Sequence, residues 1–169
     1  RLCSDESEEN FSITTDLDLS CIPDAITLEF LSNEIQQSEI YIAAGFTLTI
    51  SAAHASNLSI NGLGSLVLKD LTNSPSANLS NIEPSTVTID GYASLAQIAT
   101  LDAPAGSVLA YSKIRDTANN LSTNAGNFVS ANVTDIEIAS AATISQLSTI
   151  QSYSQTAAIT FDTILGSIS

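Results

Sequence analysis

The sequence lacks Met and Trp altogether, and aromatic residues make up only 5% of its 169 positions. Aromatic side chains each bury a large area and dominate the cores of many compact globules. Here they are too scarce for that role, although 44% of the residues are hydrophobic. Ile, Leu, Val and Ala must therefore form the core in thin layers, which favours a stack of small repeats over a compact globule.

Positive charge is nearly absent. The chain carries 18 Asp and Glu residues but only four Lys and Arg, so its formal net charge is −14. Nucleic-acid binding needs clustered cations that displace counterions from phosphates, and anionic membrane surfaces attract the same residues. The charge balance argues against both partners. Solubility is its simplest explanation, with saline surroundings or divalent cations as alternatives.

Cysteine and histidine are also scarce, which limits covalent and metal chemistry. The two cysteines, Cys3 and Cys21, are not spaced as metal ligands, and the single histidine, His54, is remote from them in sequence. We predict a disulfide between the two cysteines that closes off the first strand and indicates an oxidising compartment. Two buried, unpaired thiols are the alternative.

Long apolar runs are missing as well. No stretch reaches the roughly 18 apolar residues that a membrane-spanning helix requires, so we expect no membrane span. No secretory signal peptide is recognisable, and the chain begins at Arg1 rather than Met. We interpret the chain as a processed form or a fragment of a longer protein.

What the sequence does contain is an internal repeat. VTIDGYASLAQIATL begins at residue 87 and IEIASAATISQLSTI begins at residue 136, a shift of 49 positions. Apolar positions correspond throughout, with Val87 aligned to Ile136, and the alignment continues, after one inserted residue, to Tyr111 and Phe161. Self-similarity at such a period predicts a repeat architecture.

Two periodicities alternate within each repeat. Four segments are rich in β-branched residues or alternate between apolar and polar residues, which predicts strands. They are residues 86–90, 108–114, 134–139 and 157–164. The segments beginning at Leu95 and Ile144 have apolar residues at helical spacing. They open with the capping-box patterns Ser94-x-x-Gln97 and Thr143-x-x-Gln146, and a third helix is predicted to start at Asp116. Each strand-plus-helix unit is then about 22 to 25 residues long, so that the 49-residue repeat contains two units.

The first half is less regular. Residues 11–19 and 40–50 predict strands, and Pro23 opens a predicted helix. Residues 58–71 predict short strands separated by turns at Gly62 and Gly64. Pro75 and Pro84, each flanked by polar residues, are expected to break the chain before the regular repeats begin.

We predict a right-handed solenoid of stacked parallel β-strand rungs, a β-solenoid that becomes strand–helix repeats in its second half. Residues 1–35 would form an N-terminal cap held by the Cys3–Cys21 disulfide, 36–85 irregular β-solenoid rungs, and 86–169 the strand–helix repeats, together one continuous domain. The last unit is apolar and has no polar capping repeat. We therefore expect it to continue into further chain or to dock onto another subunit.

Two long segments of the sequence resemble a known family of repeats. They are FTLTISAAHASNLSINGLGSLVLKDLTNSPSANLSNI and IRDTANNLSTNAGNFVSANVTDIEIASAATISQLSTI. They resemble the degenerate repeats, of the DTAxNL…NAG and VTVTDAATxAQL type, of large secreted surface proteins of bacteria, notably cyanobacterial and marine ones. The resemblance covers roughly residues 46–164. It implies a role at the cell surface, in adhesion, in an appendage or in a viral fibre, and it carries no catalytic residues across.

Candidate sites are few, and we predict no catalytic residues. His54 lies among small residues without a nucleophile pattern and is expected at the surface or in a turn. Asp16 and Asp18 would face the same side of a strand, about 7 Å apart. Asp90, Asp116 and Asp135 recur after strands, where an aspartate either caps the next helix or, stacked with others, binds Ca²⁺. We retain these five aspartates as a candidate calcium site, and expect no other cofactor.

The sequence thus predicts an extracellular structural protein that is not an enzyme, a building block of a surface layer, appendage, filament or fibre. Its partners would be further copies of itself or other subunits of a surface assembly. One alternative is a monomeric adhesive module that binds glycan or cations. The other is a polysaccharide-active β-solenoid enzyme, which requires acids to converge with Lys113 and Arg115 in one groove.

Overall fold

A computed structural model describes residues 10–13, 17–18, 39–102 and 106–166 of the chain. The predicted helix after Pro23, the Cys3–Cys21 disulfide and most of the predicted N-terminal cap lie outside these residues.

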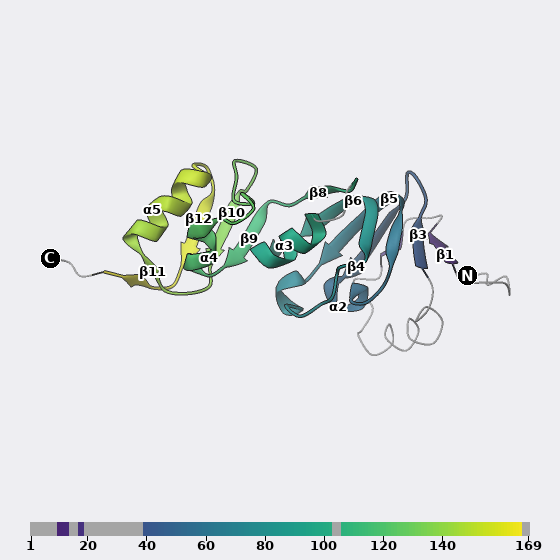
Figure 1. Cartoon of the computed structure of the whole chain (residues 1–169), viewed down its shortest axis with the longest axis horizontal. Helices are drawn as coiled ribbons and strands as arrows, with labels where there is room; N and C mark the ends of the chain where they lie inside the picture. Colours follow the sequence, from purple (N-terminus) through teal and green to yellow (C-terminus); the bar gives the residue numbers. More distant parts are fainter. Residues whose placement is uncertain (1–9, 14–16, 19–38, 103–105, 167–169) are drawn as a thin grey trace.

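The described part of the chain progresses along the long axis of the molecule, from β1 near one end to β11 near the other (Figure 1). Strands dominate the first half, and strands alternate with short helices in the second. The strands and helices are β1 (Asn10–Ile13), β2 (Leu17–Asp18), β3 (Glu39–Ile42), β4 (Thr47–Ser51), α2 (Ala52–Ala55), β5 (Ile60–Lys69), a 3-10 helix (Leu71–Asn73), β6 (Ile82–Asp90), β7 (Tyr92–Ala93), α3 (Leu95–Asp102), β8 (Val108–Ala110), β9 (Lys113–Asp116), α4 (Ala118–Thr123), β10 (Asp135–Ile138), β11 (Ala142–Thr143), α5 (Ile144–Tyr153), β12 (Ala158–Phe161) and β13 (Ile164–Leu165).

Every strand pair in the described residues is parallel. The largest sheet has seven strands, and its long strand β5 pairs with β3 along its first part, with β4 along its second part, and with β6 along both. A four-stranded sheet has the order β12-β10-β9-β7, and β11 pairs with β13. The predicted combination of parallel strands and helices is therefore confirmed.

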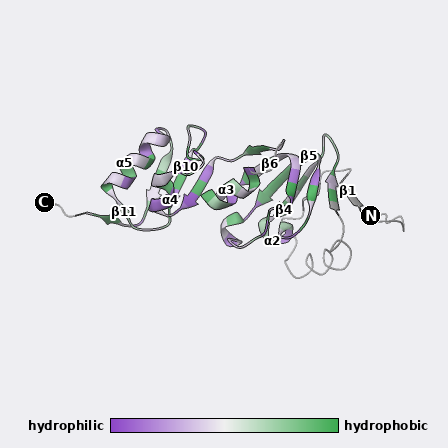
Figure 2. Cartoon of the chain, in the orientation of Figure 1, coloured by the Kyte–Doolittle hydropathy of each residue, from purple (hydrophilic) through white to green (hydrophobic). Residues whose placement is uncertain are grey.

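The strand register places side chains of the same kind in line across the sheets. Ile40 pairs with Ile60 and Ile60 with Ile82, and all three are almost fully buried. Hydrophobic and hydrophilic residues alternate along several strands (Figure 2), and in such strands one set of side chains faces inward and the other outward. Burying an Ile or Leu side chain stabilises the fold by roughly 1.5–3 kcal/mol, so these aligned residues hold neighbouring strands together.

The core has the predicted composition. The largest fully buried side chains in the described part of the chain are all Ile or Leu, from Ile40 through Leu101. Helices add to this aliphatic core from outside the sheets, with Ile98, Leu121 and Ile150 fully buried. An aliphatic core of this kind needs no aromatic centre.

Hydroxyl side chains cap the helices. The predicted capping boxes are confirmed: the Gln97 amide donates to Ser94 Oγ and the Ser94 amide to Gln97 Oε1, and Thr143 and Gln146 make the same pair of bonds. The third predicted helix start is also confirmed, since α4 begins after Thr117, whose hydroxyl accepts from the Asn120 amide. Each cap satisfies an amide that the helix leaves without a partner.

Three strand boundaries differ from the predictions. Gly62 and Gly64 do not mark turns but lie within β5, where the register shifts between Gly62 and Ser65. Gly64 is buried, and a Cβ there would lie 2.5 Å from the Ala43 carbonyl oxygen, so the glycines allow close approach of the neighbouring backbone. Pro84 does not break the chain but lies buried within β6. Residues 108–114 form two strands, β8 and β9, with Tyr111 between them.

The strands that the 49-residue repeat aligns lie in different sheets. Val87 pairs with Leu109 in the large sheet, whereas Ile136 pairs with Ile114 and Ile159 in the four-stranded sheet. Strands of both sheets have the same two-residue alternation, so an alignment of apolar positions does not distinguish them.

The two glycines Gly62 and Gly91 provide a matched test of close packing in the large sheet. Both have positive φ, +115° and +118°, but a Cβ on Gly62 would lie 2.3 Å from the Ile42 carbonyl oxygen, whereas one on Gly91 meets nothing within 4 Å. We expect Gly91→Ala to lower the free energy of unfolding by about 1–2 kcal/mol through backbone strain alone. Gly62→Ala should cost clearly more, because the Ile42 backbone must also move. Equal losses in urea unfolding would contradict this role for Gly62.

Candidate functional site

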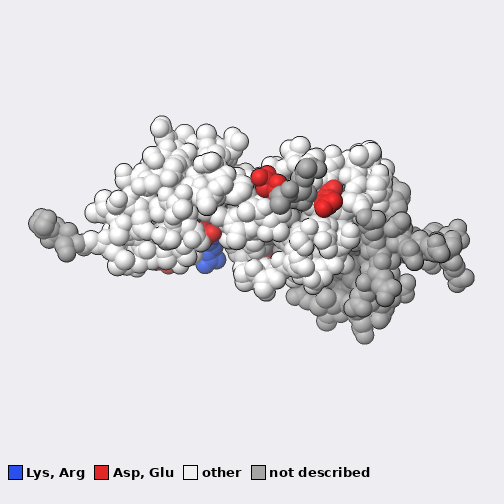
Figure 3. All heavy atoms as spheres, viewed as in Figure 1, with Lys and Arg blue, Asp and Glu red and all other residues white. Residues whose placement is uncertain are grey.

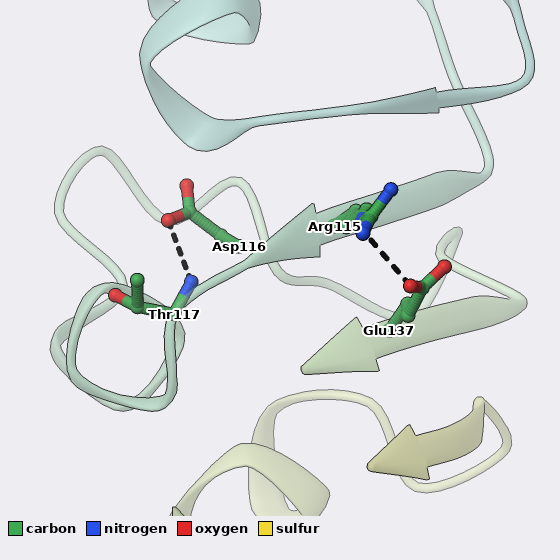
Figure 4. A network of polar contacts seen from close by, with 4 residues as sticks. All are labelled: Arg115, Asp116, Thr117 and Glu137. Carbon is green, nitrogen blue, oxygen red and sulfur yellow. Dashed lines mark hydrogen bonds and ion pairs between the residues drawn. The ribbon is translucent and has the colours of Figure 1, made fainter. Parts of the chain in front are cut away.

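Asp116, one of the predicted calcium ligands, serves as a cap for two helices. One carboxylate oxygen, Oδ2, accepts from the Leu95 amide, the first of α3, at 2.9 Å. The other accepts from the Thr117 amide at 2.8 Å, shown in Figure 4, and from the Asn120 side chain at 2.7 Å. Its bond to Leu95 joins two units that are 21 residues apart in sequence. The capping interpretation of the recurring aspartates therefore holds at this position.

The other predicted ligands are not gathered around Asp116. Asp90 is exposed and lies 4.0 Å from Lys69, and Asp135 accepts a hydrogen bond from the Thr134 hydroxyl at 2.8 Å. Asp18 belongs to β2, and Asp16 lies outside the described residues. Within residues 10–13, 17–18, 39–102 and 106–166 no three His, Cys, Asp or Glu residues are grouped so that they could hold a metal ion. Calcium binding stays a prediction.

The described cations contact residues on neighbouring strands. Arg115 Nε lies 3.1 Å from Glu137 Oε1 across the β9–β10 pair (Figure 4). Lys113 Nζ lies 5.8 Å from the centre of the Tyr92 ring on β7. On the face drawn in Figure 3 the blue side chains lie in one place, next to β9, with an acidic side chain beside them. Exposed ion pairs of this kind contribute roughly 0–1 kcal/mol each, and they add attraction between successive strands.

His54 was predicted at the surface or in a turn, but it is buried within α2. Its Nδ1 and the Ser51 hydroxyl oxygen are hydrogen bonded at 2.8 Å, and its amide donates to the same oxygen at 3.4 Å. His54 therefore occupies the position that Gln97 and Gln146 hold in the later helices, three residues after the hydroxyl cap. The pattern Ser51-x-x-His54 has the same spacing as the capping boxes, so the sequence could have indicated a helix that starts after Ser51 with His54 in its first turn.

Two stacked asparagines form a corner of the first half. Both Asn57 and Asn78 begin the sequence Asn-Leu-Ser, and the Asn78 side-chain amide donates to Asn57 Oδ1 at 3.1 Å. The Asn57 amide donates to the Asn78 carbonyl at 2.9 Å. Asn57 has φ +66°, a conformation that asparagine tolerates better than most residues. The recurrence of Asn-Leu-Ser after 21 residues is the sequence signal that could have predicted this contact.

A pocket of about 540 Å³ opens beside Tyr111, between the connection that leads into β9 and the one that leads into β10. Its lining residues are Asp102, Leu109, Ala110, Tyr111, Gly126, Phe128, Ser130 and Asn132. The Tyr111 hydroxyl donates to the Phe128 carbonyl at 2.9 Å and ties the two connections together. Neither Lys113 nor Arg115 lines this pocket, so the convergence of acids and cations that the enzyme alternative requires is not formed there.

Apolar side chains are exposed around the last described strands. They are Ile144, Phe161, Ile164 and Leu165, which are between 38% and 67% exposed. Phe161 on β12 is in register with Ile138 on β10. Ile138 is only 2% exposed, and we attribute this burial to its pairing with the further strand β12. In the described residues β12 pairs only with β10 and β13 only with β11, so each leaves one edge open.

Comparisons with protein-family models, with curated proteins and with solved structures found no match to this chain. The helices in the described part of the chain are all too short or too polar to cross a membrane.

Replacing Asp116 tests whether it caps helices. Asp116→Ala leaves the part-buried Leu95 amide without its acceptor, and we expect a loss of about 1–3 kcal/mol in the free energy of unfolding. Asp135→Ala removes the same charge but only one bond to a neighbouring side chain, so it should cost no more than about 0.5 kcal/mol. Unfolding is measured in calcium and in chelator. If calcium stabilises the wild type and this effect disappears in Asp116→Ala, Asp116 is a metal ligand.

Burial raises the pKa of Tyr111 above its ordinary value of 10.0, and the Asp102 carboxylate raises it further. The unfolded chain ionises this tyrosine near pH 10.0 while the folded chain keeps it protonated, so ionisation favours unfolding and stability falls as the pH rises above 10.0. We expect Tyr111→Phe to be less stable at neutral pH by about 1 kcal/mol, because a hydrogen bond is lost. It should also lose less stability in alkali than the wild type. Parallel alkaline stability curves would contradict this.

Proposed function

We propose that this chain is an extracellular structural building block, folded as a right-handed β-solenoid and assembled with further subunits into a cell-surface layer, appendage, filament or fibre. The observation that carries this proposal is the nearly constant spacing of the strand pairs from β5 onward. Leu66 pairs with Val87, Val87 with Leu109, and Ile114 with Ile136, so each partner lies about 22 residues further along the chain, within the range of repeat architectures.

Side-chain hydrogen bonds with the same spacing support the solenoid. Ala118 donates its amide to Ser140 Oγ across 22 residues, and the fully buried Ser154 hydroxyl donates to the Val133 carbonyl across 21. Each bond ties one unit to the next. In such a fold every unit contacts only its neighbours, so length can grow without a change in the core. That property suits a structural element.

The open strand edges support assembly. A strand edge that carries unpaired backbone groups next to exposed apolar side chains pairs readily with another chain. Among the strands that the structure describes, β12 and β13 combine these two features, with Phe161, Ile164 and Leu165 exposed beside their open edges. The acidic charge keeps isolated subunits soluble, and assembly then depends on this surface rather than on charge attraction.

The adhesive alternative is favoured by one observation, the pocket beside Tyr111. The composition of that pocket is compatible with a small ligand of a monomeric binding module. Both functions are compatible with one chain, since the pocket and the open edges of β12 and β13 are built from different residues.

Light scattering on the purified chain tests assembly. We expect particles larger than the 17.6 kDa of one chain, with a mass that rises with concentration. Ile164→Gln should return the particles to monomers, because it removes apolar surface beside β13 without changing the charge. Leu63→Gln is the matched control, since Leu63 is even more exposed, at 68%, but lies on β5.

A monomer under all conditions, or equal effects of the two variants, would contradict assembly through this surface. Repeating the measurement with Ca²⁺ and with excess chelator tests whether the aspartates take part.

A further inference from the structure

The pocket beside Tyr111 has two rigidly held aromatic walls. The Tyr111 ring is part-buried, and its hydroxyl is bound to the Phe128 carbonyl. The Phe128 ring lies directly on Gly126, where a Cβ would come within 2.3 Å of Cε2. Both rings also pack against the core, and these contacts restrict their movement before a ligand arrives, which lowers the entropic cost of binding.

The charge of the pocket lining is negative. Asp102 is the only ionisable residue besides Tyr111 among the eight that line it, and none of the eight is Lys or Arg. Asp102 ends helix α3, whose last turn contains no basic residue. A carboxylate at the C-terminal end of a helix is unfavourable, because the helix dipole is negative there. The Asp102 side chain is exposed, and within the described residues its carboxylate makes no hydrogen bond and no ion pair.

We propose that this pocket binds an organic cation, an alkylammonium group that lies against the Tyr111 and Phe128 rings with its charge facing the Asp102 carboxylate. Aromatic faces attract such cations through their quadrupole, and quaternary ammonium groups are recognised by aromatic rings in this way. The carboxylate and the carbonyl end of α3 supply the complementary negative potential. This proposal goes beyond the assembly function and does not depend on it.

Other ligand classes fit the pocket less well. A calcium ion takes six to eight oxygen ligands, and the pocket offers a single carboxylate. An anion would be repelled by Asp102. A neutral sugar could stack on the rings and bind Ser130 and Asn132, but it would gain less from the negative charge of Asp102 than a cation does. At about 540 Å³ the pocket also has room for the groups that carry the ammonium, such as a head group or a lysine side chain.

The binding site can be tested on monomers by NMR, with the chain in the Ile164→Gln background so that assembly does not enter the result. Choline chloride is titrated at constant ionic strength, with sodium chloride and glucose as separate probes. We expect saturable shifts at Tyr111, Gly126 and Phe128 with choline only. Asp102→Asn should weaken choline binding by roughly tenfold or more, through loss of the charged partner. Asp90→Asn makes the same charge change outside the pocket and should leave the affinity unchanged.

Phe128→Leu separates cation recognition from simple burial, because it keeps the pocket apolar but removes one aromatic face; a loss of roughly threefold or more is expected. No saturable choline shifts, or a choline affinity that Asp102→Asn and Asp90→Asn change equally, would overturn the proposal. Saturable glucose shifts without choline shifts would assign the pocket to a neutral glycan instead.

Discussion

The fold depends on parallel pairing of each strand with the strand of the next unit, with like side chains in register. Ile40, Ile60 and Ile82 follow one another across three strands, and Ile114, Ile136 and Ile159 do so in another sheet. Parallel strands bring corresponding residues of successive units side by side, so a short sequence motif that recurs at the right interval forms a continuous buried row. The aliphatic composition follows from this, since each row needs residues of similar shape and has no wide centre for large rings to fill.

Polar residues contribute to the same contacts between units. Asp116, Ser140 and Ser154 each make a side-chain bond to a unit 21 or 22 residues away, and Asn57 and Asn78 stack at a corner. Strand pairing leaves helix ends and corners with free amides and carbonyls, and these side chains satisfy them. An aspartate that looks like a calcium ligand in the sequence can therefore use both of its carboxylate oxygens to cap helices, as Asp116 does. Asp102 differs from these caps, because it is exposed at the pocket and its carboxylate makes no bond within the described residues.

The two proposals concern different parts of the molecule. The proposed assembly depends on the strand edges and apolar side chains near β13. In earlier units the corresponding edges and side chains are covered by the next strand. Cation binding depends on loops between strands, which vary in length without disturbing the buried rows. A repeat fold separates these properties, so that a structural element can carry a binding site on its side.

The sequence by itself determined the kinds of elements and their local signals. Alternating aliphatic residues indicated the strands. Two helix starts were indicated by Ser94-x-x-Gln97 and Thr143-x-x-Gln146, because a capping box needs only residues three positions apart, and a third by the segment that begins at Asp116. Tertiary structure decided which strand pairs with which, since Val87 and Ile136 have the same pattern but belong to different sheets. It also decided that Gly62 lies inside a strand, that His54 is buried, and that Asp116 caps a helix that begins 21 residues earlier. These outcomes depend on contacts between units, and local periodicity does not specify the partner of a strand or what surrounds a polar side chain.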